Sequence, residues 1–132
     1  MNLAESLLGA CERHPELEAM PGIPYGELLP RIRRIAGGLG VEPDERVAFV
    51  LDNRVETPLL YWACQWAGAV AVPLSWRLSD DELAYCIEDC GAALVIREND
   101  TVPDGAGHPG ALDRAERETS LILYTSGTTG RP

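Results

Sequence analysis

The sequence predicts an α/β fold, a mostly parallel sheet with flanking helices, from two features of its apolar pattern. Continuous apolar runs at 46–51, 69–74 and 92–96 suit strands that are covered on both faces. Helical patterns at 57–68 and 79–91 separate these runs, and such strand–helix–strand units join parallel strands through right-handed crossovers. The chain has 132 residues, of which 45% are hydrophobic, so it is long enough for one domain with a buried core.

A short amphipathic helix and a hairpin are expected at the N-terminus. Asn2 and Glu5 have the spacing of a capping box, in which each side chain bonds the other residue's backbone. Pro21 and Gly22 are the residues that a type II turn favours, and they stand between two short extended pieces. One apolar stripe of the helix consists of Leu3, Leu7 and Cys11.

Residues 26–40 predict a second amphipathic helix. Pro30 must lie near its first turn or kink it, because proline cannot donate an internal helix bond. A run of glycines, Gly37, Gly38 and Gly40, is expected to end the helix. The predicted buried face comprises Leu28, Ile32, Ile35 and Leu39, and the solvent face carries Arg31, Arg33 and Arg34.

The helix at 57–68 is predicted to start with Thr57 as its N-cap and Pro58 at its first position, and to end near Gly68. The next helix, at 79–91, opens with Ser79, which has Glu82 in capping-box spacing. Acidic residues fill its first turn, which suits the positive end of the helix dipole.

A polar, turn-rich segment at about 97–118 is predicted to be irregular. It leads to "SLILY", residues 120–124, which we expect to form a fourth strand. That strand would deliver the chain to the loop at 125–130.

Composition excludes several classes of function. The net charge of −10 argues against a nucleic-acid partner, because phosphate backbones are bound by clustered cations. All 11 basic residues are arginine, so no lysine chemistry is available in this chain. The N-terminus is too acidic for a signal peptide, and no segment has the length of a transmembrane helix. We therefore expect a cytoplasmic protein.

The four cysteines lack the paired spacing of a zinc site, and both histidines lie far from them in sequence. Cys86 and Cys90 are four residues apart and share a helical face with Leu83 and Ile87. We interpret them as small core residues and predict no metal site.

The loop at 125–130 has the parts of an anion cradle. It offers hydroxyl donors, its glycines let the backbone turn its N–H groups inward, and it follows a predicted parallel strand. It is not a Walker A loop, since both the spacing and the lysine of that motif are absent. A solvated turn of the same composition is the alternative. The candidate binding residues are Thr125, Ser126, Gly127, Thr128, Thr129 and Gly130.

The string "YTSGTTGRP" resembles the phosphate-binding signature of the adenylate-forming superfamily. Further segments, "ERVAFVLDN" and "YWACQWAGAVAVPLSWRLSDDELAYCIEDCGAALVI" among them, occur in the order of that family's N-terminal region. The resemblance implies that residues 1–132 are the N-terminal portion of an AMP-binding domain, ending inside the phosphate-binding loop. The spacing between "AALVI" and "SLILY" is shorter than the family commonly has, which leaves the local sheet topology open.

Within the family, "VPLSWRLSDDELAY" is most similar to fatty-acid and related acid–CoA ligases. The implied reaction uses ATP, Mg2+, a carboxylic acid and coenzyme A, and forms an acyl-adenylate before the thioester. Catalytic residues would lie downstream, so we expect the 132 residues alone to be inactive. We expect Trp76 to be a partly buried packing aromatic and Arg77 a surface charge or a carboxylate partner. The alternatives are an amino-acid adenylating enzyme and a stand-alone phosphate-binding module without catalysis.

Overall fold

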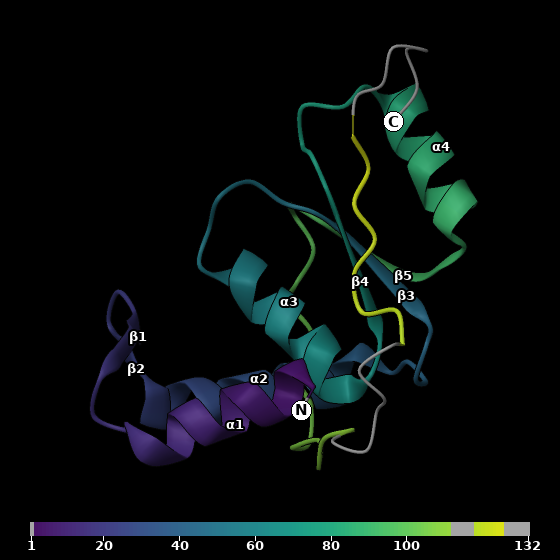
Figure 1. Cartoon of the computed structure of the whole chain (residues 1–132). Coiled ribbons are helices and arrows are strands. Elements are labelled where there is room, and N and C mark those ends of the chain that lie inside the picture. The colour runs from purple at the N-terminus through teal and green to yellow at the C-terminus, as the bar shows by residue number, and fades with distance from the viewer. Residues whose placement is uncertain (1, 112–117, 126–132) are drawn as a thin grey trace.

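A computed structural model describes residues 2–111 and 118–125 of the chain. Two sheets form within these residues: an antiparallel hairpin, β1-β2, and a three-stranded parallel sheet in the order β4-β3-β5 (Figure 1). This confirms the predicted α/β fold. The elements are α1 (Leu3–Arg13), β1 (Glu18–Met20), β2 (Ile23–Pro24), α2 (Tyr25–Leu39), β3 (Arg46–Val50), α3 (Glu56–Ala67), β4 (Val70–Leu74), α4 (Asp80–Cys90) and β5 (Ala92–Arg97).

The sheet has a hydrophobic core on each face, because successive residues of β3 point to opposite sides. Val47 and Phe49 belong to the larger core, which α1, α2 and α3 cover. Ala48 and Val50 belong to a smaller core on the other face, which α4 covers. Figure 1 shows α4 separated from the other three helices by the strands.

The predicted caps of α1 and α4 are confirmed. Asn2 and Glu5 form a reciprocal capping box at the start of α1. Ser79 and Glu82 do the same at the start of α4. Gly91 ends α4 in the left-handed conformation that glycine adopts without steric cost.

The prediction that Thr57 caps α3 is wrong. The helix begins at Glu56, and Val55 before it already has helical backbone angles. The Thr57 hydroxyl instead donates to the carbonyl oxygen of Asp52 at 2.8 Å. Pro58 consequently lies in the first turn but not at its first position. Gly68 ends α3 as predicted.

The prediction for α2 is correct for its faces and partly wrong for its glycines. The predicted apolar stripe is buried and the three arginines are exposed. Pro30 lies inside the helix, in its second turn. Gly40 alone ends the helix, whereas Gly37 and Gly38 remain within it.

These two helical glycines make room for the irregular segment that follows β5. A Cβ on Gly37 would overlap the carbonyl oxygen of Ala106, and one on Gly38 would lie 2.5 Å from the backbone nitrogen of Asp104. The backbone N–H groups of Gly105 and His108 donate to α2 carbonyl oxygens at 3.0 and 2.9 Å. We call residues 104–108 the strap, since they fasten this segment across α2.

Candidate functional site

The run 120–125, which leads to the predicted loop, lies beside β4. The backbone N–H of Ala71 donates to the carbonyl oxygen of Ser120 at 3.0 Å, and the N–H of Ile122 donates to Ala71 at 2.9 Å. The buried Gln65 side chain of α3 adds a second donor to Ser120, at 2.9 Å. Leu121 and Ala71 thus form a parallel bridge. The run therefore travels toward the carboxyl edge of the sheet, as Figure 1 shows.

The expectation of a full fourth strand is wrong for the described residues, in which this run makes only that one bridge. Backbone N–H groups alternate in direction along a strand, so residue 73 faces the same neighbour as Ala71. Residue 73 is proline, which has no N–H to donate. The parallel ladder therefore loses its next hydrogen bond.

Tyr124 fastens the end of the run to α4. Its hydroxyl donates to a carboxylate oxygen of Asp89 at 2.7 Å, and its ring packs against the smaller core. Burial, followed by the hydrogen bond and charge of Asp89, raises the pKa of Tyr124 above its ordinary value. The hydroxyl consequently stays protonated and donating at neutral pH.

Thr125 is the first residue of the predicted loop, and it is exposed immediately after this anchor. The other candidate residues, Ser126, Gly127, Thr128, Thr129 and Gly130, lie outside the described residues. Their binding role stays a prediction.

Charged residues that follow β3 and β5 pair with one another at the same edge. Arg54 pairs with Asp52 at 2.7 Å and with Glu98 at 3.4 Å. The hydrogen bond that Arg54 donates to the Asp52 carboxylate raises the pKa of Arg54, which therefore stays charged. Because two carboxylates already hold this guanidinium, it is not free to meet a phosphate.

Trp76 and Arg77 follow β4 and are both exposed. The expectation that Trp76 is partly buried is wrong, because 57% of the residue is accessible. The Arg77 guanidinium lies 5.2 Å from the centre of its ring, a cation–π arrangement. The interpretation of Arg77 as a surface charge is confirmed.

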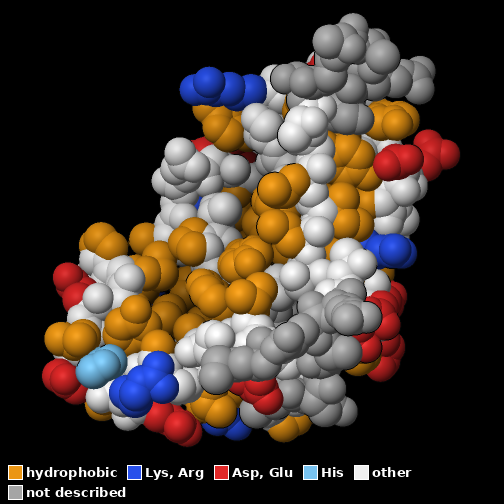
Figure 2. Space-filling model, viewed as in Figure 1, with side chains coloured by type: hydrophobic (Ala, Val, Ile, Leu, Met, Phe, Trp, Pro, Cys, Tyr) orange, Lys and Arg blue, Asp and Glu red, His pale blue; other side chains and the backbone are white. Residues whose placement is uncertain are grey.

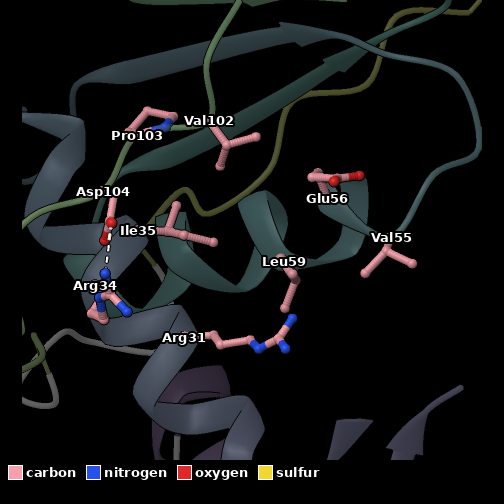
Figure 3. Close-up of a pocket in the computed structure, with 9 residues that line it drawn as sticks. All are labelled: Arg31, Arg34, Ile35, Val55, Glu56, Leu59, Val102, Pro103 and Asp104. Carbon is pink, nitrogen blue, oxygen red and sulfur yellow. Dashed lines mark hydrogen bonds and ion pairs between the residues drawn. The ribbon is translucent and has the colours of Figure 1, made fainter. Parts of the chain in front are cut away.

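A separate pocket of about 310 Å³ lies between α2, α3 and residues 102–104 (Figure 3). Its side chains include the ion pair of Arg34 with Asp104, 2.7 Å long, and Arg31, which extends along the apolar Leu59. None of its lining residues belongs to the run 120–125. The pocket is therefore separate from the described residues that lead to the predicted phosphate site.

The four cysteines are buried free thiols, which confirms the interpretation of Cys86 and Cys90 as core residues. Burial raises the pKa of every one of them, that of Cys64 to about 12. Such thiols are poor nucleophiles at neutral pH. Within residues 2–111 and 118–125, no three His, Cys, Asp or Glu side chains form a group that could hold a metal ion.

The sequence matches the family described as "AMP-binding enzyme" over residues 9–117. The chain belongs to this family, as the resemblance implied. Among the described residues, no helix has both the length and the apolarity needed to cross a membrane.

Three relatives with curated descriptions are named as CoA synthases or ligases. Feruloyl-CoA synthase of an Amycolatopsis species is 38% identical, over 82% of this chain and 26% of its own length. The 4-hydroxybenzoate–CoA/benzoate–CoA ligase of Rhodopseudomonas palustris is 33% identical, over 66% of this chain and 17% of its own length. The long-chain-fatty-acid–CoA ligase FadD13 of Mycobacterium tuberculosis is 31% identical, over 77% of this chain and 26% of its own length. The chain thus spans about a quarter or less of their length.

Solved structures show the same fold. The N-terminal domain of FACL13 from Mycobacterium tuberculosis, crystallised with an inhibitor, matches 99% of this chain and 42% of that chain, with a TM-score of 0.84 and 26% identity. The second structure is the N-terminal subdomain of Klebsiella oxytoca NpsA in complex with 3-hydroxyanthranilyl-AMSN. The similarity covers 99% of this chain and 39% of the NpsA chain, with a TM-score of 0.78. At 20% identity the second likeness concerns the fold alone.

Proposed function

We propose that this chain is the N-terminal portion of an ATP-dependent acid–CoA ligase. In the proposed reaction a substrate carboxylate attacks the α-phosphate of ATP and expels pyrophosphate. The thiol of coenzyme A then attacks the acyl-adenylate, and AMP leaves. The observation that carries the proposal is the family match over residues 9–117, together with the three relatives described above, which are named as CoA synthases or ligases.

The loop from Thr125 to Gly130 is proposed to hold the β- and γ-phosphates during the first step. Its hydroxyl and backbone donors would meet the charge that grows on the leaving pyrophosphate and keep that group in line. Two features support this role: the sequence of the loop, and the course of residues 120–125 toward the carboxyl edge of a parallel sheet, where α/β folds bind ligands.

Arg54, which follows β3 at the carboxyl edge of the sheet, is not a free countercharge for a nucleotide. Arg54 is held by two carboxylates, and the described part of the chain contains no candidate group of metal ligands. We therefore assign neither Mg2+ nor a catalytic step to these residues. In this proposal the remaining countercharge, the acyl pocket and the catalytic groups come from sequence beyond the 132 residues.

One face of the chain is compatible with such a larger protein. Figure 2 shows hydrophobic side chains gathered in the middle of the viewed face, where Figure 1 places α3 and β4. Leu123 in the run beside β4 is 64% exposed, and Val55 before α3 is 42% exposed. An apolar area of this kind favours cover by further protein.

The test is ATP–pyrophosphate exchange by the protein that the complete reading frame encodes. The panel of acids includes ferulate, 4-hydroxybenzoate, benzoate and long-chain fatty acids, after the relatives, and a set of amino acids. Exchange with a carboxylic acid, followed by CoA thioester formation, would support the proposal. Exchange with amino acids alone would assign the chain to another adenylating enzyme. No exchange with any acid would favour a phosphate-binding module without catalysis.

A further inference from the structure

The chain has few attachments between its bridge to β4 and the predicted loop. The last backbone hydrogen bond to β4 that the structure shows comes from Ile122, and Pro73 removes the next donor on β4. Leu123 is largely exposed. Among residues 122–125, the next polar attachment is the bond from the Tyr124 hydroxyl to Asp89.

We propose that Tyr124 is a positioning residue for the phosphate-binding loop: held by Asp89 of α4, it fixes the direction in which the chain enters Thr125. This inference rests on the proposed function, because it names a residue that acts on the same nucleotide site. Tyr124 does not itself touch the phosphates in this scheme. It acts by holding the backbone of the residue that begins the loop.

The geometry around Asp89 favours a lasting bond. Asp89 lies in the last turn of α4, where the helix dipole disfavours a negative charge and where no basic residue is present. The Tyr124 hydroxyl supplies the missing donor at 2.7 Å, a length typical of a bond to a charged acceptor. The ring is meanwhile held by the smaller core, next to Cys86 and Cys90.

The anchor also joins the run 120–125 to a helix from another part of the chain. Asp89 and Tyr124 are 35 residues apart, and α4 covers the face of the sheet opposite α1, α2 and α3. A change at Asp89 should therefore reach the nucleotide step although Asp89 itself binds no substrate. This expectation distinguishes a positioning role of Tyr124 from a role in local packing alone, which would not make the nucleotide step depend on Asp89.

The test uses the protein of the complete reading frame and four variants. Tyr124→Phe keeps the ring and removes the hydroxyl, and Asp89→Ala removes its acceptor. Asp89→Asn keeps an acceptor oxygen and should behave like the wild type. Tyr61→Phe is the matched control, since it removes a hydroxyl from α3, in the helix layer on the other face of the sheet.

We expect Tyr124→Phe and Asp89→Ala each to raise the KM for ATP in pyrophosphate exchange by about threefold to tenfold, the effect of one lost hydrogen bond. The double variant should be no worse than either single variant, because both remove the same contact. Transfer from preformed acyl-adenylate to coenzyme A should keep its rate. An unchanged KM for ATP, or equal losses in both half-reactions, would overturn the positioning role.

A wild-type protein that shows no exchange with any acid refutes the proposed function, and the anchor is then judged by equilibrium binding of ATP. Weaker ATP binding by Tyr124→Phe than by the wild type and Tyr61→Phe would support the anchor. Equal affinities, or no binding by the wild type, would overturn it.

Discussion

Replacing Gly37 by alanine tests whether the strap is seated on α2 as the structure shows. Gly37 lies inside α2, where alanine is normally preferred over glycine by about 1 kcal/mol. A Cβ at this position would overlap the carbonyl oxygen of Ala106, which is backbone and cannot rotate away. The strap would have to lift from the helix.

The expected loss of stability follows from what the strap would give up. Lifting it weakens the hydrogen bonds from Gly105 and His108, which are worth about 0.5–1.5 kcal/mol each. It also disturbs the bond from the Trp66 indole nitrogen to His108, 2.9 Å long. After the gain in helix propensity is subtracted, we expect Gly37→Ala to lower the free energy of unfolding by about 1–3 kcal/mol.

Gly9→Ala is the matched control, because Gly9 also lies inside a helix. A Cβ there would meet only the end of the Arg13 side chain, at 2.9 Å, and that exposed side chain can move aside. Gly9→Ala should therefore raise stability, by up to about 1 kcal/mol. Urea unfolding followed by circular dichroism measures both variants. A Gly37→Ala protein as stable as Gly9→Ala would refute the seating of the strap.

Three further predictions concern the rest of the chain. Burial raises the pKa of Cys64 from 9.0 to about 12, so the unfolded chain loses this proton first; the contribution of Cys64 to the free energy of unfolding should be steady below about pH 8 and should fall above pH 9, by up to about 1.4 kcal/mol per pH unit. Urea unfolding against pH measures this, and Cys64→Ala should have a shallower slope; an equal slope would contradict the assignment. Pro73→Ala restores a donor on β4 and should slow amide hydrogen exchange of Tyr124, whereas unchanged exchange would show that proline does not stop the ladder. The 132 residues alone should stay at background in ATP–pyrophosphate exchange, because Arg54 is already paired and the chain has net charge −10; exchange above background would place the catalytic groups within them.

Much of the fold could be predicted from sequence because the signals were local. Asn2 with Glu5 and Ser79 with Glu82 each bond across three residues, so their spacing alone fixes the two helix starts. The buried strands could be predicted equally well, because a short continuous apolar run is typical of a strand that is covered on both faces.

Two of the errors arose where a residue's partner lies outside its own element. The sequence predicts that Gly37 ends a helix, but its lack of a Cβ instead lets the strap, about 70 residues later, lie close to α2. Thr57 before a proline has the pattern of an N-cap, whereas its hydroxyl bonds Asp52 in the preceding turn. Trp76 was expected to pack, yet it stacks with the neighbouring Arg77 at the surface.

The sequence suggests a candidate loop, but it does not predict the contacts that hold the chain before that loop. The loop motif points to phosphate chemistry through residue types alone, whereas the contact between Tyr124 and Asp89 depends on how α4 and the run 120–125 lie across β4. No spacing rule reaches across such a separation.

Pro73 is the residue from which part of that support could have been deduced. Proline inside a strand is confined to sheet edges, or to positions where its nitrogen has no partner strand. In "AVAVPL" it therefore argues against a complete ladder on one side of β4, the side that residues 120–124 occupy. A chain that loses its backbone attachment there must be directed by a side chain if it is to present a defined loop. Tyr124 stands two residues after the last such bond, and its ring lies over the core beneath α4. The proline thus accounts for both the missing strand and the need for an anchor, and restoring the donor at residue 73 should lessen the effect of Tyr124→Phe on the KM for ATP.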